Sequence, residues 1–204
     1  MSILTAPLPE TVSVGSQCVP IETSFRAGIL FEQLALDDNL SVENILRVYY
    51  GDRWPEPYEE AINAAIWFYR CGLKPEKPKQ ESSGHKLKSI KRGYDFEIDA
   101  EDIYTSFLQS YGIDLLTEDL HWWVFRALLF RLPDNTPFKQ KVYYRTGSTK
   151  GMGKKQKKEF EERRKRYALP ERGAIDHKLS LMERDDAIKR YVDGRFKEAE
   201  KQKA

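Results

Sequence analysis

The sequence predicts a mainly α-helical protein, in which a small N-terminal β-hairpin is followed by a multi-helix bundle, a flexible basic linker and a peripheral C-terminal helix. In most segments apolar residues recur at three- and four-residue spacing, and capping residues, glycines and prolines bound these segments. Hydrophobic residues make up 40% of the 204 residues and aromatic residues 12%, which is enough for a core without disulfides. Cys18 and Cys71 are the only cysteines and belong to no CxxC pair, which argues against a disulfide framework and a thiolate metal site. We therefore expect the protein to reside in a reducing cytosol.

The first region, residues 1–73, should hold the hairpin and three helices. Thr11–Val14 alternates apolar and polar residues, Gly15 begins a turn, and Gln17–Ile21 forms the returning strand. The helices that follow are bounded by capping or stop residues: one from Thr23 or Ser24 to the stop at Asp37-Asp38-Asn39, one from Ser41 to Gly51, and one from Pro55 or Pro57 to Tyr69.

Two changes of composition divide the rest of the chain. Residues 74–93 are rich in lysine, proline and serine, which predicts a flexible linker. Residues 94–170 should form an aromatic and basic helical region, and residues 171–204 a tail helix whose end frays. The helices expected within 94–170 run from Asp95 or Asp99 to Gly112, from Thr117–Asp119 to Pro133, from Pro137 through Tyr143, and from Lys154 to Leu169 before Pro170.

Two adjacent tryptophans, Trp122 and Trp123, stand in the largest apolar concentration of the chain, Leu120–Leu129. On a helix they point about 100° apart, so one should pack inward while the other meets another element or a partner. We favour burial of most of both faces within the subunit, and the alternative is that one face is a subunit or client interface; Trp122 is taken as structural and Trp123 as the side chain to test. The partner-binding hypothesis covers five aromatic residues: Trp122, Trp123, Phe130, Trp67 and Phe68.

Charge is unevenly distributed along the chain, although the net charge is only +2. Met1–Arg70 contains ten acidic and four basic residues, Tyr94–Leu120 eight acidic and no basic residues, and Lys139–Arg166 twelve basic and three acidic residues. Such blocks can attract each other within the fold, between copies or toward a charged partner. The hypothetical charged contact surface consists of six residues of the basic helix: Lys154, Lys155, Lys157, Lys158, Arg163 and Arg164.

This basic helix leaves two interpretations open. Phosphate contacts by its lysines and arginines would give salt-sensitive, largely nonspecific nucleic-acid binding. The simpler interpretation is a solvated helix with the pairs Glu159–Arg163 and Glu161–Lys165, balanced by the acidic blocks. Because the net charge is close to zero, we favour the second interpretation and do not expect a nucleic-acid partner.

The histidines and acidic residues show no metal-binding pattern, and we expect no metal and no cofactor. His85, His121 and His177 are scattered without ligand spacing, and His121 is expected to be a packed or hydrogen-bonded histidine. The acidic run Asp95–Asp102 lacks the glycine and the terminal glutamate of a calcium loop, so helix capping and a solvated face are expected there.

Motifs for catalysis, nucleotide binding and membrane insertion are also missing. Residues 147–155 lack the GxxxxGK[ST] order of a phosphate-binding loop, and no GxSxG occurs. We therefore expect a noncatalytic protein. The start lacks a basic stretch followed by a long apolar run, and no segment reaches about 18 apolar residues, so neither secretion nor membrane insertion is expected.

Ordered segments over about residues 1–170 resemble the phage gene product fifteen family, found in tailed phages and prophages of Gram-positive bacteria. The segments that carry this resemblance are Leu4-Thr5, Pro7-Leu8-Pro9, Phe25-Arg26, Phe31-Glu32-Gln33-Leu34, Ile66-Trp67-Phe68-Tyr69, Cys71-Gly72, Phe107-Leu108-Gln109, Tyr111-Gly112-Ile113-Asp114-Leu115, Leu120-His121-Trp122-Trp123, Phe125-Arg126-Ala127-Leu128, Tyr144-Arg145 and Tyr167-Ala168-Leu169-Pro170.

The resemblance implies a tail assembly chaperone. Such a protein binds the tape measure protein in the host bacterial cytoplasm, helps the tail tube assemble around it, and is absent from the mature virion. The major tail protein is a further candidate partner, and self-association into a homo-oligomer is expected. The resemblance implies no catalytic residue. A nucleic-acid-binding phage factor and a permanent structural tail component remain the alternatives.

Overall fold

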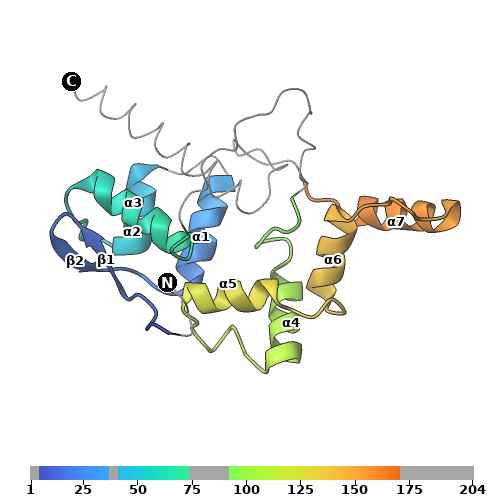
Figure 1. The fold of residues 1–204 in the computed structure, drawn as a ribbon, viewed down its shortest axis with the longest axis horizontal. Coiled ribbons are helices and arrows are strands. Elements are labelled where there is room, and N and C mark those ends of the chain that lie inside the picture. Colours follow the sequence, from blue (N-terminus) through green and yellow to red (C-terminus); the bar gives the residue numbers. More distant parts are fainter. Residues whose placement is uncertain (1–4, 37–40, 74–91, 171–204) are drawn as a thin grey trace, which may run out of the picture.

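The computed structural model describes residues 5–36, 41–73 and 92–170. Within these ranges the chain forms seven helices and one two-stranded antiparallel sheet, which confirms the mainly α-helical fold with an N-terminal hairpin (Figure 1). The elements are β1 (Thr11–Val14), β2 (Gln17–Pro20), α1 (Phe25–Leu36), α2 (Val42–Tyr50), α3 (Tyr58–Tyr69), α4 (Ala100–Tyr111), α5 (Trp122–Phe130), α6 (Pro137–Thr146) and α7 (Lys154–Arg166).

The hairpin lies against the start of α3. Val12 and Val14 alternate into the core, as their spacing predicts for a half-buried strand. Gly15 takes a positive φ of 59° at the turn, where a side chain would be strained. Its backbone N–H donates to a carboxylate oxygen of Glu60 at 2.6 Å, which ties the hairpin tip to α3.

The first three helices begin and end close to the predicted residues. Ser41 caps α2 by accepting a hydrogen bond from the Asn44 backbone N–H at 3.0 Å. Gly51 ends that helix with φ of 64°, and its N–H donates to the Arg47 carbonyl oxygen at 3.0 Å. The predicted helix from Thr23 or Ser24 is confirmed as α1, whereas its predicted stop at Asp37-Asp38-Asn39 lies outside the described residues.

The core is continuous across the molecule because α5 packs between the N-terminal helices and α4. The Phe125 ring of α5 stacks on Phe25 of α1, with centroids 4.7 Å apart, and on Phe107 of α4, with centroids 5.2 Å apart. Regions 1–73 and 94–170 therefore share one hydrophobic core.

The expected cap of the aromatic helix at Thr117–Asp119 is wrong. The helix begins at Trp122, and the cap is His121, whose Nδ1 accepts from the Trp123 backbone N–H at 3.1 Å while Nε2 lies 3.1 Å from the Pro9 carbonyl oxygen. Asp119 instead accepts hydrogen bonds from Ser24 and Arg26 at the start of α1. His121 is thus hydrogen-bonded, as predicted.

Replacing His121 with alanine should lower the free energy of unfolding by about 1 kcal/mol, because the α5 N-terminus loses its only side-chain cap. The measurement is urea unfolding followed by circular dichroism. Asparagine, itself a good N-cap residue, should recover about half of the loss. Equal stabilities for the alanine and asparagine variants would show that the cap contributes nothing.

Other boundaries differ from prediction by a few residues. The basic helix α7 ends at Arg166, before Leu169. The expected linker falls outside the described residues except for Arg92 and Gly93, and Arg92 is buried in the folded part. The predicted C-terminal helix of residues 171–204 lies outside the described ranges altogether.

Candidate partner-binding surfaces

Both tryptophans of α5 are buried against the end of α3. Trp122 is 1% exposed and Trp123 is 6% exposed. Each indole Nε1–H donates to a carbonyl oxygen in the last turn of α3, Trp122 to Tyr69 at 2.7 Å and Trp123 to Phe68 at 2.8 Å. The final carbonyls of a helix have no partner within the helix, and the two indoles supply partners from outside.

This placement corrects the partner-binding hypothesis for three of its five aromatic residues. Trp122 is structural, as predicted, but Trp123 and Phe68 are core side chains too, so their substitution would report on folding. Trp67 and Phe130 retain exposed fractions of 36% and 37%. The Trp67 ring lies edge-on to Trp123, with centroids 5.6 Å apart, at the margin of this core.

A groove of about 660 Å³ runs between α1 and α2. Apolar side chains are prominent among its lining: Ala27, Leu30 and Leu34 of α1 and Val48 of α2. Leu30 is 47% exposed, so its side chain leaves apolar surface open at the groove. Helix α1 is apolar on more than one side, and Leu34 and Val48 are partly buried where they pack against the core.

The two basic side chains that line this groove, Arg26 and Arg47, are each paired with a carboxylate. Arg26 binds Asp119 at 2.9 Å and also donates to the Leu115 carbonyl oxygen at 2.8 Å. Arg47 binds Glu43 one turn earlier in α2 at 3.1 Å. The groove therefore combines an apolar floor with a balanced polar rim, an arrangement suited to the apolar face of a partner helix.

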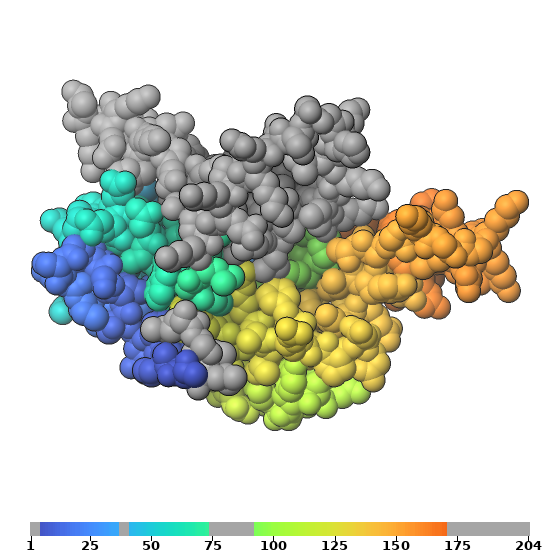
Figure 2. Space-filling model, in the orientation of Figure 1, coloured from blue at the N-terminus to red at the C-terminus, as the bar shows by residue number. Residues whose placement is uncertain are grey.

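A second surface is the arm formed by α6 and α7, in which α6 packs against α4 and α7 projects from the body of the molecule (Figure 2). Phe160 is the one buried residue of α7, and its ring packs against Tyr143 and Tyr144 of α6. Gly147 is required at the turn between the helices, since a Cβ there would lie 2.5 Å from the Tyr143 carbonyl oxygen and 3.0 Å from Phe160.

The six basic residues predicted as a contact surface divide into two groups. Arg163 and Arg164 turn toward α6: Arg163 donates to the Tyr144 hydroxyl, and Arg164 to the carbonyl oxygens of Tyr144 and Gly147. Four lysines are exposed: Lys154, Lys155, Lys157 and Lys158. The expected pairs Glu159–Arg163 and Glu161–Lys165 are not among the ion pairs of the described residues. Glu161 pairs with Arg164 instead.

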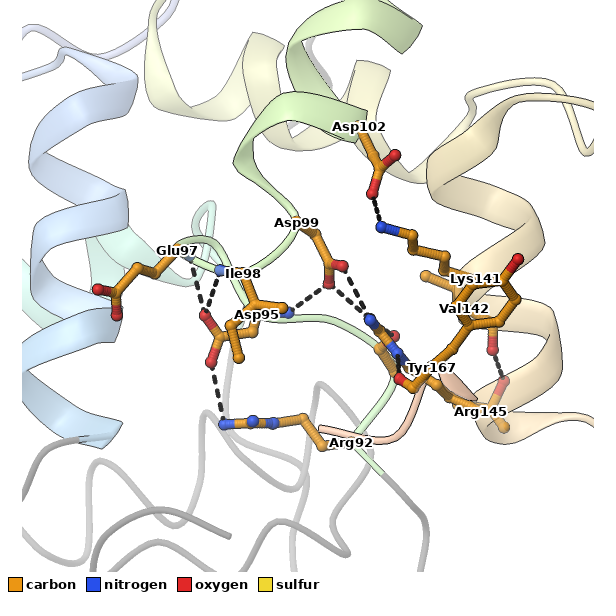
Figure 3. A network of polar contacts seen from close by, with 12 residues as sticks. Arg92, Asp95, Glu97, Ile98, Asp99, Asp102, Lys141, Val142, Arg145 and Tyr167 are labelled. Atoms are coloured by element: carbon orange, nitrogen blue, oxygen red, sulfur yellow. Dashed lines mark hydrogen bonds and ion pairs between the residues drawn. The ribbon is translucent and has the colours of Figure 1, made fainter. Parts of the chain in front are cut away.

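A buried ion pair fixes the arm to the body (Figure 3). Arg145, near the end of α6, donates to both carboxylate oxygens of Asp99, the residue before α4, at 2.5 and 2.9 Å. The same guanidinium donates to the carbonyl oxygens of Gly93 and of Tyr167, the residue after α7. The Arg145 and Asp99 side chains are 4% and 0% exposed, so solvent screens their attraction little.

Neighbouring groups extend this contact. Arg92 lies 3.2 Å from Asp95, and both side chains are almost fully buried. Asp95 also accepts the backbone N–H groups of Glu97 and Ile98, and Lys141 pairs with Asp102 nearer the surface (Figure 3). The expected solvated acidic face is therefore wrong for Asp95 and Asp99. Both are buried structural carboxylates, and Asp99 holds the arm through Arg145.

The part of the chain that the structure describes contains no group of three or more histidine, cysteine or acidic side chains placed to hold a metal ion. In the same residues no helix has both the length and the apolar character needed to cross a bilayer.

Comparison with known proteins identifies the family of this chain. The family model described as "Bacteriophage Gp15 protein" matches residues 4–169, which include every described helix and both strands. No curated protein and no solved structure matches the chain. The chain is a phage protein, and it belongs to the bacteriophage Gp15 family.

Proposed function

We propose that this protein is a noncatalytic tail assembly chaperone that binds the tape measure protein in the host cytoplasm. It would help the tail tube assemble and then leave before the virion is complete. Membership of the bacteriophage Gp15 family supports the phage context. The observation that carries the client-binding part is the open apolar groove between α1 and α2.

The groove suits one kind of client, a long amphipathic helix. Leu30 and Leu34 lie one turn apart on α1, and Val48 faces them from α2, so an apolar stripe on a partner helix can lie along the floor. Because the arginines at the rim are paired with carboxylates, the groove has no large potential of one sign. It should therefore not favour a strongly acidic or a strongly basic partner. A weak contact of this kind can be repeated along a repetitive client.

Replacing Leu30 with lysine should weaken tape measure binding at least about tenfold, because it places a charge on the apolar floor. The measurement is pull-down of the tape measure protein after co-expression, followed by titration of the purified pair. Leu116→Lys is the matched control, because Leu116 is 74% exposed and does not line the groove.

Equal loss of binding in the Leu30→Lys and Leu116→Lys variants would contradict the groove as the binding surface. Failure of the wild-type chain to bind or solubilise the tape measure protein would contradict the chaperone role. Salt-dependent retention of DNA would favour the nucleic-acid-binding alternative, whose support is the basic arm. Presence of the chain in finished virions would favour a permanent tail component.

A further inference from the structure

The two ends of the molecule's longest axis carry opposite charge. The hairpin and the start of α3 lie at one end of this axis, and α7 lies at the other (Figure 1). Residues 52–60 contain four acidic residues and one arginine, whereas α7 contains eight basic and three acidic residues. Because the ends are far apart, α7 cannot reach the acidic end of its own chain.

The basic end has an outer face that turns away from α6. Since Phe160 faces α6, the helical repeat places the opposite face at positions 154, 155, 158, 162, 165 and 166. These positions are all exposed and hold five basic side chains and Glu162. Among the described residues, the one ion pair that α7 makes is Arg164–Glu161, which lies outside this face.

The acidic end offers both charge and apolar surface. Asp52, Glu56, Glu59 and Glu60 are exposed there. Tyr58, which is 39% exposed, stands among them, edge-on to Trp54. A hydrogen bond with Glu56, and then the charge of that carboxylate, raise the pKa of Tyr58 above its ordinary value. Lysine side chains can lay their aliphatic stems on such rings while the ammonium groups meet carboxylates.

We propose that the outer face of α7 docks on the acidic end, residues 52–60, of a second copy, so that copies associate head to tail. The two surfaces differ, so the contact is heterologous, and a pair of copies keeps one free acidic end and one free basic face. Successive copies then form a ring or an open chain according to the rotation between neighbours.

A second copy accounts for the charges better than nucleic acid does. A chain built to bind phosphates usually has a strong positive excess, whereas this one has a net charge of +2 and places its acidic cluster at the opposite end. The buried Arg145–Asp99 pair holds the arm in a fixed direction, and a fixed direction is needed for a repeating contact. This inference goes beyond the proposed function, since it requires no client.

Charge reversal tests the contact with the full chain alone. We expect the wild-type protein to self-associate at low salt and to dissociate at about 1 M salt, where the Debye length falls to about 3 Å. Lys155→Glu with Lys158→Glu, and separately Asp52→Lys with Glu59→Lys, should each weaken association at least about tenfold. Sedimentation velocity over a concentration series measures this.

Mixing the two variants is the decisive step. In each variant alone, the reversed side chains meet charge of their own sign on the other docking surface and repel it. In the mixture, the reversed side chains on the arm of one variant can pair with those in residues 52–60 of the other, so association should recover. Glu101→Lys with Glu118→Lys changes the net charge as much as the acidic-end variant does and should associate like the wild type. Circular dichroism checks that each variant is folded. If one of the two charge-reversed variants does not fold, the self-association of the other variant still tests the contact.

Three results would overturn the proposal. They are a wild-type chain that stays monomeric at low salt, reversed variants that associate normally, and a mixture that does not recover association. Loss of DNA retention in Lys155→Glu with Lys158→Glu, with self-association unchanged, would likewise overturn it and assign the face to nucleic acid.

Discussion

Replacing Arg145 with alanine is expected to lower the free energy of unfolding by about 3–5 kcal/mol, the cost of leaving a buried charge without its partner. Asp99 is 0% exposed and would keep only the Asp95 backbone N–H as a donor. The carbonyl oxygens of Gly93 and Tyr167 would lose a donor as well. Urea unfolding followed by circular dichroism measures the change.

The Lys141–Asp102 pair is the matched control, because it joins the same two helices closer to solvent. Its side chains are 28% and 21% exposed, so Lys141→Ala should cost only about 1 kcal/mol. A similar cost for the two alanine variants would show that burial does not decide the strength of these pairs. Limited proteolysis should also cut the arm faster in Arg145→Ala, because the arm loses its anchor.

Replacing Gly28 with alanine is expected to destabilise the fold by about 2–3 kcal/mol, although alanine normally favours a helix by about 1 kcal/mol. A Cβ at this position would lie 2.3 Å from two ring atoms of Trp122. The indole cannot move away freely, because it donates to the Tyr69 carbonyl oxygen and stacks on the Tyr69 ring.

A smaller residue at position 122 isolates this contact. In a Trp122→Leu background the added methyl group has space, so Gly28→Ala should cost much less there than in the wild type. Comparison of the four proteins in a double-mutant cycle measures the coupling. If the effects of the two substitutions on the free energy of unfolding are additive, Gly28 and Trp122 are not in close contact. Stabilisation of the wild type by Gly28→Ala would also contradict the close approach of α1 and α5.

Local signals in the sequence account for most of the secondary structure. The hairpin, the Ser41 cap and the stops at Gly51 and Gly112 depend on residues close together in the chain, so pattern and turn chemistry are sufficient to predict them. His121 is the exception, because imidazole is an uncommon cap and the acidic residues before it offered a more ordinary one.

Contacts between distant segments could not be predicted in the same way. Asp99 and Arg145 are 46 residues apart, and charge counts alone assigned the acidic run to a solvated face. The sequence leaves open whether Trp123 faces the core or a partner, because it does not show that the end of α3 accepts both indoles. The groove depends on how α1 and α2 lie together, so the exposure of Leu30 has no signal in the sequence.

Co-expression of the wild-type chain with the tape measure protein, followed by size-exclusion chromatography with light scattering, tests the chaperone role most directly. The proposed function predicts that the tape measure protein stays soluble and elutes in one complex with this chain, and that Leu30→Lys separates the two. A tape measure protein that aggregates, or that elutes apart from the wild-type chain, would contradict it.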